Sequence, residues 1–293
     1  MKVMVLGANG MLGNAIMRSF SQIAGLSFWG TVRSERAKIL FPPNLQKNLI
    51  TGVDVTQVDH LKTLLLEYEP DITINCIGLV KQRADANEAQ QAITLNALLP
   101  HQLADLTKEM GARLMLISTD CVFSGLKGEA YTENDLADPV DLYGKTKFLG
   151  EIANRSHVLT LRTSYIGNEM MGETSSHGLL EWFLSQSQSV RGFTRAIYSG
   201  LPTVVLSSLI RDTLLSRPDL SGLYHVSSEP ISKYNLLQLL NIKFEKQLEV
   251  VPDDQLEINR SLDSTRLLNV TGFRAPSWEA MIHTMYLDRI SHV

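Results

Sequence analysis

Tyr143 and Lys147 are the pair whose residue types and spacing point most directly to acid-base chemistry. Residues four positions apart on a helix project from the same face, one turn from each other. A free tyrosine has a pKa of about 10, but a cation beside the phenol stabilises the phenolate and lowers that pKa. Of the eight tyrosines, this is the one that a lysine follows four positions later. The pair predicts proton transfer with a substrate; the alternative is an ordinary pair of side chains on a helix surface.

A glycine-rich turn lies near the start of the chain, between a short apolar run and an amphipathic segment. Glycines let the backbone approach a pyrophosphate closely, and the first N–H groups of the following helix attract its charge. Three glycines could also serve only to build a tight turn. Between a strand and a helix the pattern predicts a dinucleotide-binding loop. We assign to it Gly7, Asn9, Gly10, Met11, Leu12 and Gly13.

The end of the second predicted strand distinguishes the two nicotinamide dinucleotides. In an NAD site an acidic residue about 20 residues after the loop holds the ribose 2′-hydroxyl, but this chain has Arg33 and Ser34 there. The forked donors of arginine match a 2′-phosphate, so NADP(H) is predicted, against the alternative of a solvated basic loop. Asp54, followed by Val55, ends the third strand, where it can bind the adenine amino group or cap the next helix.

The carboxyl ends of the next strands supply further candidates. Cys76, Ile77 and Gly78 lie at the end of the fourth strand and are assigned to the cofactor site. Thr119 ends the fifth strand, where ligands bind in such folds, and can hydrogen-bond a substrate carbonyl; alternatively it only terminates the strand. Asn96, which propensity disfavours inside a helix, is either a polar relay beside the cofactor or a structural residue.

Short β-branched runs alternate with amphipathic segments, which predicts an α/β fold with a doubly wound parallel sheet of the Rossmann type. Residues 1–165 are expected to form the NADP-binding domain. Residues 166–293 are expected to form mainly a smaller substrate lobe, with some segments returning to the first domain. Strands are predicted at 2–6, 26–32, 48–53, 71–77, 113–118, 158–162 and 222–226, and helices at 11–22, 58–67, 88–110, 141–154, 179–187, 207–215, 233–240 and 277–290.

Composition excludes several classes of protein. The 293 residues carry 27 Lys plus Arg and 31 Asp plus Glu, so the net charge of -4 gives no attraction to nucleic acid or to an anionic membrane. Cys76 and Cys121 have no metal-ligand spacing and are expected to be buried thiols. No signal peptide or membrane-spanning run is recognised. We therefore expect a cytoplasmic protein without a metal site.

These motifs together resemble those of the extended short-chain dehydrogenase/reductases, and specifically the dTDP-4-dehydrorhamnose reductase (RmlD-like) group. The resemblance covers nearly the whole chain and also includes residues 118–123, 162–164, 222–226 and 271–278. It implies NADPH-dependent reduction of the 4-keto group of a nucleotide-activated 6-deoxy sugar, in deoxysugar or O-antigen-type polysaccharide precursor synthesis. By this resemblance Tyr143 gives the carbonyl oxygen its proton, Lys147 lowers the tyrosine pKa and holds the nicotinamide ribose, and Thr119 orients the carbonyl.

The chain departs from the group where the sugar should bind. Cys121 and Tyr165 replace a tyrosine and a tryptophan that are common in the group, and segment 190–203 lacks an Asp-Gln pair. We place both residues and Asp120 at the sugar pocket. An N-acetylated UDP-linked sugar is therefore as open a candidate as dTDP-4-keto-rhamnose. The cations available for a substrate diphosphate, each otherwise a solvated surface charge, are Lys81, Arg83, Arg191 and Arg195.

Two other functions stay open. One is a sugar-nucleotide epimerase or dehydratase of the same superfamily. An epimerase should hold NAD(H) permanently, whereas Arg33 favours an exchangeable NADP(H). The other is a non-catalytic regulatory subunit, resembling the β subunit of methionine adenosyltransferase, against which the retained Tyr143 and Lys147 argue. The resemblance also implies a homodimer.

Overall fold

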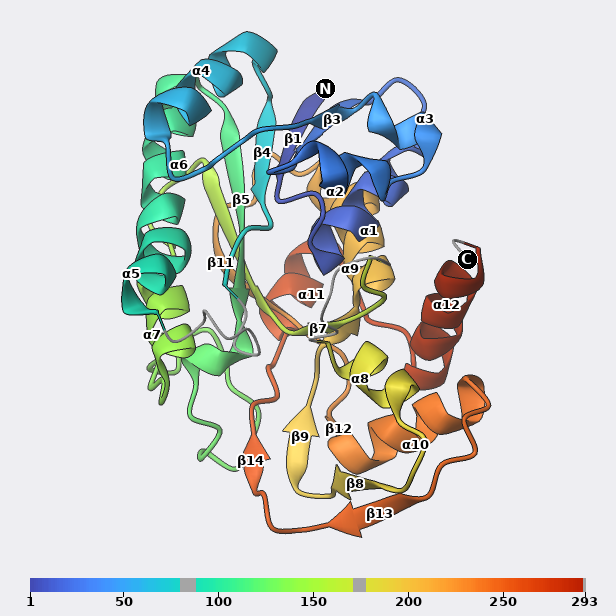
Figure 1. Ribbon diagram of the computed structural model, residues 1–293. Helices are drawn as coiled ribbons and strands as arrows, with labels where there is room; N and C mark the ends of the chain where they lie inside the picture. Colours follow the sequence, from blue (N-terminus) through green and yellow to red (C-terminus); the bar gives the residue numbers. More distant parts are fainter. Residues whose placement is uncertain (80–87, 171–177, 292–293) are drawn as a thin grey trace.

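The fold is built on a seven-stranded sheet in which every pairing is parallel, with the order β11-β6-β5-β4-β1-β2-β3 (Figure 1). The computed structural model describes residues 1–79, 88–170 and 178–291. The strand order reverses at β1, which has β2 on one side and β4 on the other. This is the doubly wound α/β sheet that the sequence predicts. Its strands are β1 Lys2–Leu6, β2 Ser27–Thr31, β3 Leu49–Ile50, β4 Ile72–Asn75, β5 Arg113–Thr119, β6 Val158–Thr163 and β11 Gly222–Val226.

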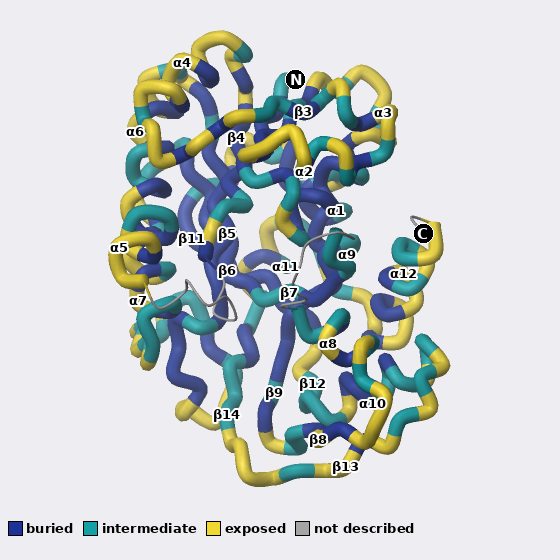
Figure 2. Tube along the Cα trace, viewed as in Figure 1, coloured by how far each residue is buried: buried dark blue, intermediate teal, exposed yellow. Residues whose placement is uncertain are grey.

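Alternate residues of β1 enter two separate cores, one on each face of the sheet. Val3 and Val5 pack with residues of α1, whereas Met4 and Leu6 pack with residues of α4 and α6. Because both faces are covered, the strands are almost uniformly apolar. Figure 2 shows the buried strands between helices that are exposed on their outer sides. The helices of this domain are α1 Met11–Phe20, α2 Glu35–Ile39, α3 Pro43–Gln46, α4 Val58–Tyr68, α5 Ala89–Ala92, the π-helix η2 Ile93–Leu98, α6 Leu99–Glu109, the 3-10 turn η3 Asp120–Val122 and α7 Leu142–Leu149.

The second half of the chain forms a smaller lobe below the carboxyl edge of the sheet, and part of it returns to the first domain (Figure 1). Helix α9 packs on α1, and β11 pairs with β6 at the edge of the large sheet. Helix α12 contacts both α9 and α10, which ties the lobe to the domain. The elements are β7 Tyr165–Ile166, α8 Leu179–Ser185, β8 Val190–Phe193, β9 Ala196–Tyr198, β10 Leu201–Pro202, α9 Thr203–Leu209, the π-helix η4 Ile210–Leu214, β12 Ile231–Ser232, α10 Lys233–Lys243, β13 Val250–Asp253, β14 Ile258–Asn259, α11 Thr265–Thr271 and α12 Trp278–Ile290.

Two of the predicted helices differ from the observed ones in continuity or length, and local packing or geometry explains the difference. The helix predicted at 88–110 is interrupted by the π-helical turn η2, a feature that is frequent at functional sites. The helix predicted at 141–154 ends at Leu149, and a Cβ on the following Gly150 would lie 2.0 Å from the carbonyl oxygen of Asn96. Close packing of α7 on η2 therefore fixes that end.

Candidate active site

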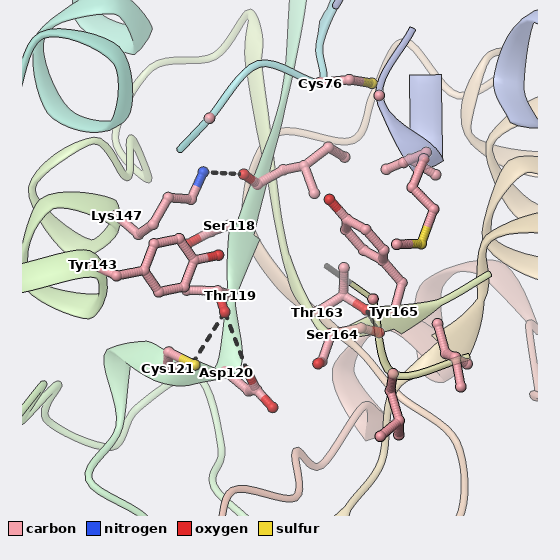
Figure 3. Close-up of a pocket in the computed structure, with 18 of the residues that line it drawn as sticks. Cys76, Ser118, Thr119, Asp120, Cys121, Tyr143, Lys147, Thr163, Ser164 and Tyr165 are labelled. Atoms are coloured by element: carbon pink, nitrogen blue, oxygen red, sulfur yellow. Dashed lines mark hydrogen bonds between the residues drawn. The ribbon is translucent and has the colours of Figure 1, made fainter. Parts of the chain in front are cut away.

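A pocket opens at the carboxyl edge of the sheet, with walls from both parts of the chain (Figure 3). The first domain contributes the loop after β1, the ends of β4, β5 and β6, and one face of α7. The second lobe contributes residues of α8, β9 and α10. The structure places in this pocket most of the residues assigned from sequence: Asn9, Gly10, Met11, Leu12, Cys76, Ile77, Gly78, Thr119, Asp120, Cys121, Tyr143, Lys147 and Tyr165.

The glycine-rich loop shapes the entry to this pocket. Gly7 has a φ of 78°, a left-handed conformation that glycine adopts without strain. A Cβ on Gly13 would lie 2.2 Å from the carbonyl oxygen of Gly7, so this glycine allows α1 to pack against the turn. Gly10 precedes α1 without a side-chain cap, which leaves the helix N–H groups to a ligand. Gly7 and Gly13 thus form the loop, while residues 9–12 between them line the pocket.

Replacing Gly13 by alanine should destabilise the protein by about 1–3 kcal/mol and weaken dinucleotide binding, because the new methyl group collides with backbone that cannot rotate away. Urea unfolding and dinucleotide titration measure both effects. Gly10→Ala is the matched control for stability, since its Cβ would meet the Gly7 oxygen at 3.4 Å, an ordinary contact. Equal stabilities of the two variants would contradict this explanation of the loop.

Helix α7 carries the candidate catalytic pair to the end of β5. The Asp141 side chain accepts a hydrogen bond from the Gly144 N–H (2.8 Å) and fixes the start of the helix. A Cβ on Gly144 would lie 2.2 Å from the carbonyl oxygen of Cys121, so the helix packs against the chain that follows β5. This contact brings Tyr143 beside Thr119 (Figure 3).

The Thr119 hydroxyl connects the groups at this end of the pocket. It donates to an Asp120 carboxylate oxygen (3.1 Å) and accepts from the Cys121 N–H (3.2 Å). The same hydroxyl lowers the pKa of Tyr143, although burial outweighs it and raises that pKa well above its usual value. The phenol therefore holds a proton at neutral pH that it can give to the more basic developing alkoxide, although the raised pKa makes it a weaker acid than a free tyrosine.

Lys147 lines the same pocket as Tyr143 and is anchored at the end of β5. Its ammonium donates a hydrogen bond to the carbonyl oxygen of Ile117 at 2.6 Å (Figure 3). Burial lowers the pKa of Lys147 to about 8, and the nearby Glu151 opposes this shift. Burial is the largest contribution to the raised pKa of Tyr143. The lowering of the tyrosine pKa by Lys147 stays a prediction.

A buried ionic network lies next to the site. Glu151 accepts hydrogen bonds from Ser118 (2.6 Å) and from Arg162 Nε (2.8 Å). Arg162 also donates to Nε2 of His225 (3.1 Å) and lies over the ring of Phe123. Both members of the Arg162–Glu151 ion pair are less than 10 % exposed. The network joins β5, β6 and β11, and its member on β5, Ser118, is the residue before Thr119.

His225 gives this network a pH dependence. Its Nδ1 lies 3.0 Å from the carbonyl oxygen of Tyr131, and its Nε2 accepts from Arg162, so the ring is held neutral. Burial, reinforced by the Arg162 charge, lowers the pKa of His225 from 6.5 to about 3. The unfolded chain therefore binds a proton that the folded protein excludes over this interval.

Stability should consequently fall as the pH is lowered from about 6.5 towards about 3. For this one proton the slope approaches about 1.4 kcal/mol per pH unit. Urea unfolding of the wild type and of His225→Gln at several pH values in this window measures the contribution. The variant should show a shallower pH dependence, and parallel curves for the two proteins would contradict the assignment.

The residues assigned to the adenosine end lie outside the pocket lining. Arg33 is exposed at the end of β2. The Ser34 hydroxyl accepts from the Ala37 N–H (3.3 Å) and caps α2. Asp54 is bound by Thr56, whose hydrogen bonds lower the pKa of the carboxyl, and Val55 is buried in the core.

Asn96 has a positioning role in the structure. Its side-chain oxygen accepts from the Leu79 N–H (2.9 Å), and its amide donates to the Thr146 hydroxyl (3.2 Å). It is buried and does not line the pocket, although a Cβ on Gly78 would come within 3.1 Å of its oxygen. The position of Asn96 therefore does not indicate a direct contact with the cofactor. Asn96 instead joins the loop after β4 to α7.

The predicted diphosphate cations are not brought to the pocket. Arg191 has 71 % of its side chain exposed and pairs with Asp253. Arg195, which follows β8, is exposed and pairs with Glu257. In β8 the buried positions beside Arg191 are Val190 and Gly192, and neither arginine lines the pocket, so their contact with a substrate diphosphate stays a prediction. Lys81 and Arg83 lie outside the described residues.

The cysteines are also placed differently from the prediction. Neither forms a disulfide, and both are of intermediate exposure and line the pocket, rather than being fully buried core residues. Within 1–79, 88–170 and 178–291, no group of three or more His, Cys, Asp or Glu side chains could hold a metal ion. Over the same residues, no helix combines the length and the apolar character needed to cross a membrane.

Several pocket residues escaped the sequence analysis. Thr163 and Ser164 were quoted only as a family motif, and Glu169 follows them in the loop after β7. Tyr198 of β9 and Lys233 of α10 belong to the second lobe. A lysine directly after the helix-capping Ser232 was the available signal for Lys233, but nothing in the sequence showed that this end of the helix would face the pocket.

The sheet order, the glycine loop at its switch point and the Tyr-x-x-x-Lys helix beside Thr119 define an extended short-chain dehydrogenase/reductase. Within this class the chain belongs to the RmlD family, since the family model described as "RmlD substrate binding domain" matches residues 1–289.

Named relatives include both reductases and a protein of another kind. The probable low-salt glycan biosynthesis reductase Agl14 of Haloferax volcanii is 28% identical, over 78% of this chain and 75% of its own. The methionine adenosyltransferase 2 subunit beta of Mus musculus is 27% identical, over 99% and 91%. The crystal structure of dTDP-4-dehydrorhamnose reductase from Bacillus anthracis, in complex with NADP, superimposes with a TM-score of 0.78 at 22% identity, covering 98% of this chain and 99% of that one.

Proposed function

We propose that the protein is an NADPH-dependent reductase of the 4-keto group of a nucleotide-activated 6-deoxy sugar, acting in deoxysugar or polysaccharide precursor synthesis. The observation that carries the proposal is the position of a protonated Tyr143 beside Thr119, in a pocket that the glycine-rich loop also borders. The part of the pocket beside the glycine-rich loop suits a dinucleotide, and the part beside Tyr143 and Thr119 suits the sugar of the substrate. Similarity to Agl14 and to dTDP-4-dehydrorhamnose reductases supports the same assignment.

The chain's own residues suit this reaction. When bound, the reduced nicotinamide supplies the hydride that adds to the carbonyl carbon. Thr119 orients the carbonyl oxygen by hydrogen bonding, and Tyr143 transfers its phenolic proton to that oxygen as the alcohol forms. Lys147, which Ile117 holds at the strand end, has further ammonium protons for the nicotinamide ribose. The residual phenolate regains a proton from solvent, which balances the reaction.

The dinucleotide fits the residues at the other end of the pocket. The uncapped start of α1 offers N–H groups to a pyrophosphate, and the approach of Gly13 to Gly7 leaves no side chain in the way. Arg33, exposed at the end of β2, supplies forked donors for the 2′-phosphate of NADPH.

Replacing Arg33 by serine should weaken NADPH binding by about 10- to 100-fold, because a charge-assisted bidentate contact is lost. NADH, which lacks the 2′-phosphate, should bind with little change. Calorimetric titration of both dinucleotides against both proteins measures this preference. An equal loss for the two dinucleotides would contradict the role of Arg33 and point to a general effect on the loop.

Turnover tests the reaction itself. NADPH oxidation should be followed with dTDP-, UDP- and GDP-linked 4-keto-6-deoxy sugars generated in situ, with free nucleoside diphosphates as controls. Oxidation with one sugar nucleotide supports the proposal and identifies the nucleotide. Absence of oxidation with every sugar, while the dinucleotide still binds, would favour a regulatory subunit, the role suggested by the similarity to methionine adenosyltransferase 2 subunit beta.

A further inference from the structure

Lys233 brings a positive charge into the pocket from the second lobe. It is the first residue of α10, and its ammonium lies 4.7 Å from the ring centre of Tyr198, another pocket residue. This cation–π contact holds the side chain along the pocket wall. Within the described part of the chain, no hydrogen bond or ion pair joins the Lys233 ammonium to a protein acceptor.

The surroundings of Lys233 place it at the catalytic end of the pocket. The side chain next to it that carries a negative charge is Asp120, and both Asp120 and Cys121, the two residues that follow Thr119, line the pocket with it. Asp120 is buried, and its carboxylate also interacts with Arg260, which lies 3.4 Å from the Cys121 sulfur. The charges of Arg260 and Lys233 thus both act on one carboxylate, which already accepts a hydrogen bond from Thr119.

A partly buried ammonium has three donors, and leaving them without acceptors is unfavourable. Tyr198 provides only a ring face, and Asp120 cannot neutralise both cations. An acceptor oxygen from a ligand would complete the set. Because Lys233 stands near the residues that follow Thr119, such an oxygen belongs beside the reacting carbonyl rather than at the nucleotide.

We infer that Lys233 is a substrate-specificity residue that donates a hydrogen bond to an acceptor oxygen on the sugar, a hydroxyl or the carbonyl of an acylamino group next to the keto carbon. The inference rests on the proposed function and specifies its substrate. Sites that hydrogen-bond a substrate group discriminate strongly against analogues that lack it, because the site's own polar group is then left unpaired.

Binding measurements test this inference without requiring turnover. The ligands are UDP-hexose, its N-acetylated counterpart, dTDP-hexose and the free nucleoside diphosphates, titrated calorimetrically into the full chain with saturating NADP+. Lys233→Met keeps the length of the side chain and removes the charge. Lys243→Met is the matched control, because Lys243 lies on the same helix with its ammonium 4.7 Å from the ring centre of Tyr286 and does not line the pocket.

Lys233→Met should weaken binding of at least one sugar nucleotide by about 10- to 100-fold and leave the free diphosphates unchanged. A loss confined to the N-acetylated sugar identifies the acyl carbonyl as the acceptor, and a shared loss identifies a hydroxyl. Equal losses for sugar nucleotides and free diphosphates, or no loss for any ligand, would overturn the inference. Failure of the proposed function differs from these outcomes, since it appears as intact, Lys233-dependent sugar binding without NADPH oxidation.

Discussion

Replacing Tyr143 by phenylalanine is expected to lower kcat by about 10²- to 10⁴-fold, because the proton donor for the developing alkoxide is lost. The ring remains, so the packing of α7 against the end of β5 should be unchanged. Stopped-flow or steady-state NADPH oxidation measures the loss, and kcat and kcat/KM should fall together. The affinity for NADPH should stay close to that of the wild type.

Tyr224→Phe is the matched control for this variant. Tyr224 is also buried, but it lies on β11 and does not line the pocket. Its loss of a hydroxyl should leave kcat unchanged. Full activity of Tyr143→Phe would show that another group gives the proton, and Thr119 would then be the first residue to test.

Replacing Arg162 by methionine is expected to destabilise the protein by about 3–5 kcal/mol, since the Glu151 carboxylate is then buried without its partner. The loss also removes the donor to His225 and the cation over Phe123. Urea unfolding monitored by circular dichroism measures the change. If Arg162→Met does not accumulate as a folded protein, Arg162→Lys provides a milder version, which keeps the charge and loses the forked geometry.

Arg155→Met is the corresponding control on the surface. Arg155 pairs with Asp105, whose side chain is 66% exposed, and such pairs contribute about 0–1 kcal/mol. Arg162→Met should therefore destabilise the protein clearly more than Arg155→Met. Equal and small effects would mean that water or repacking satisfies Glu151, and that the network does not stabilise the sheet below Thr119.

The first domain could be predicted from sequence because its elements are local. The run at 2–6 and the glycines after it occur in the order that a βα unit requires, and β1 and α1 start where they were predicted. Thr119 and Tyr143 could be assigned to one site because strand ends and helix starts meet at one edge of a parallel sheet. The direction of the pKa shift of Tyr143 could not be predicted, since burial in the folded pocket is its largest cause.

The second lobe was harder to predict because its strands are short and pair with distant segments. Strand β9 pairs with both β12 and β14, and each contributes only two residues to the pairing. Such strands carry little periodic signal, so which side of the lobe Arg191 would face could not be read from sequence. Lys233 was missed for the same reason, because only the folded lobe brings α10 to Asp120.

The substitutions that distinguish this chain from the RmlD-like group lie where the sugar is proposed to bind. Cys121 and Tyr165 both line the pocket, on opposite sides of the space beside Thr119 (Figure 3). Together with Lys233 they change the size and polarity of that space.

Hydride transfer to the sugar can be followed with NADPH that carries deuterium at both hydrogens of C4 of the nicotinamide. The protein should be incubated with the labelled cofactor and the panel of 4-keto sugar nucleotides, and the sugar products analysed by NMR. The sugar product should carry deuterium at the former carbonyl carbon, and the Tyr143→Phe variant should not form this product. A sugar product without deuterium, or no product although both ligands bind, would contradict it.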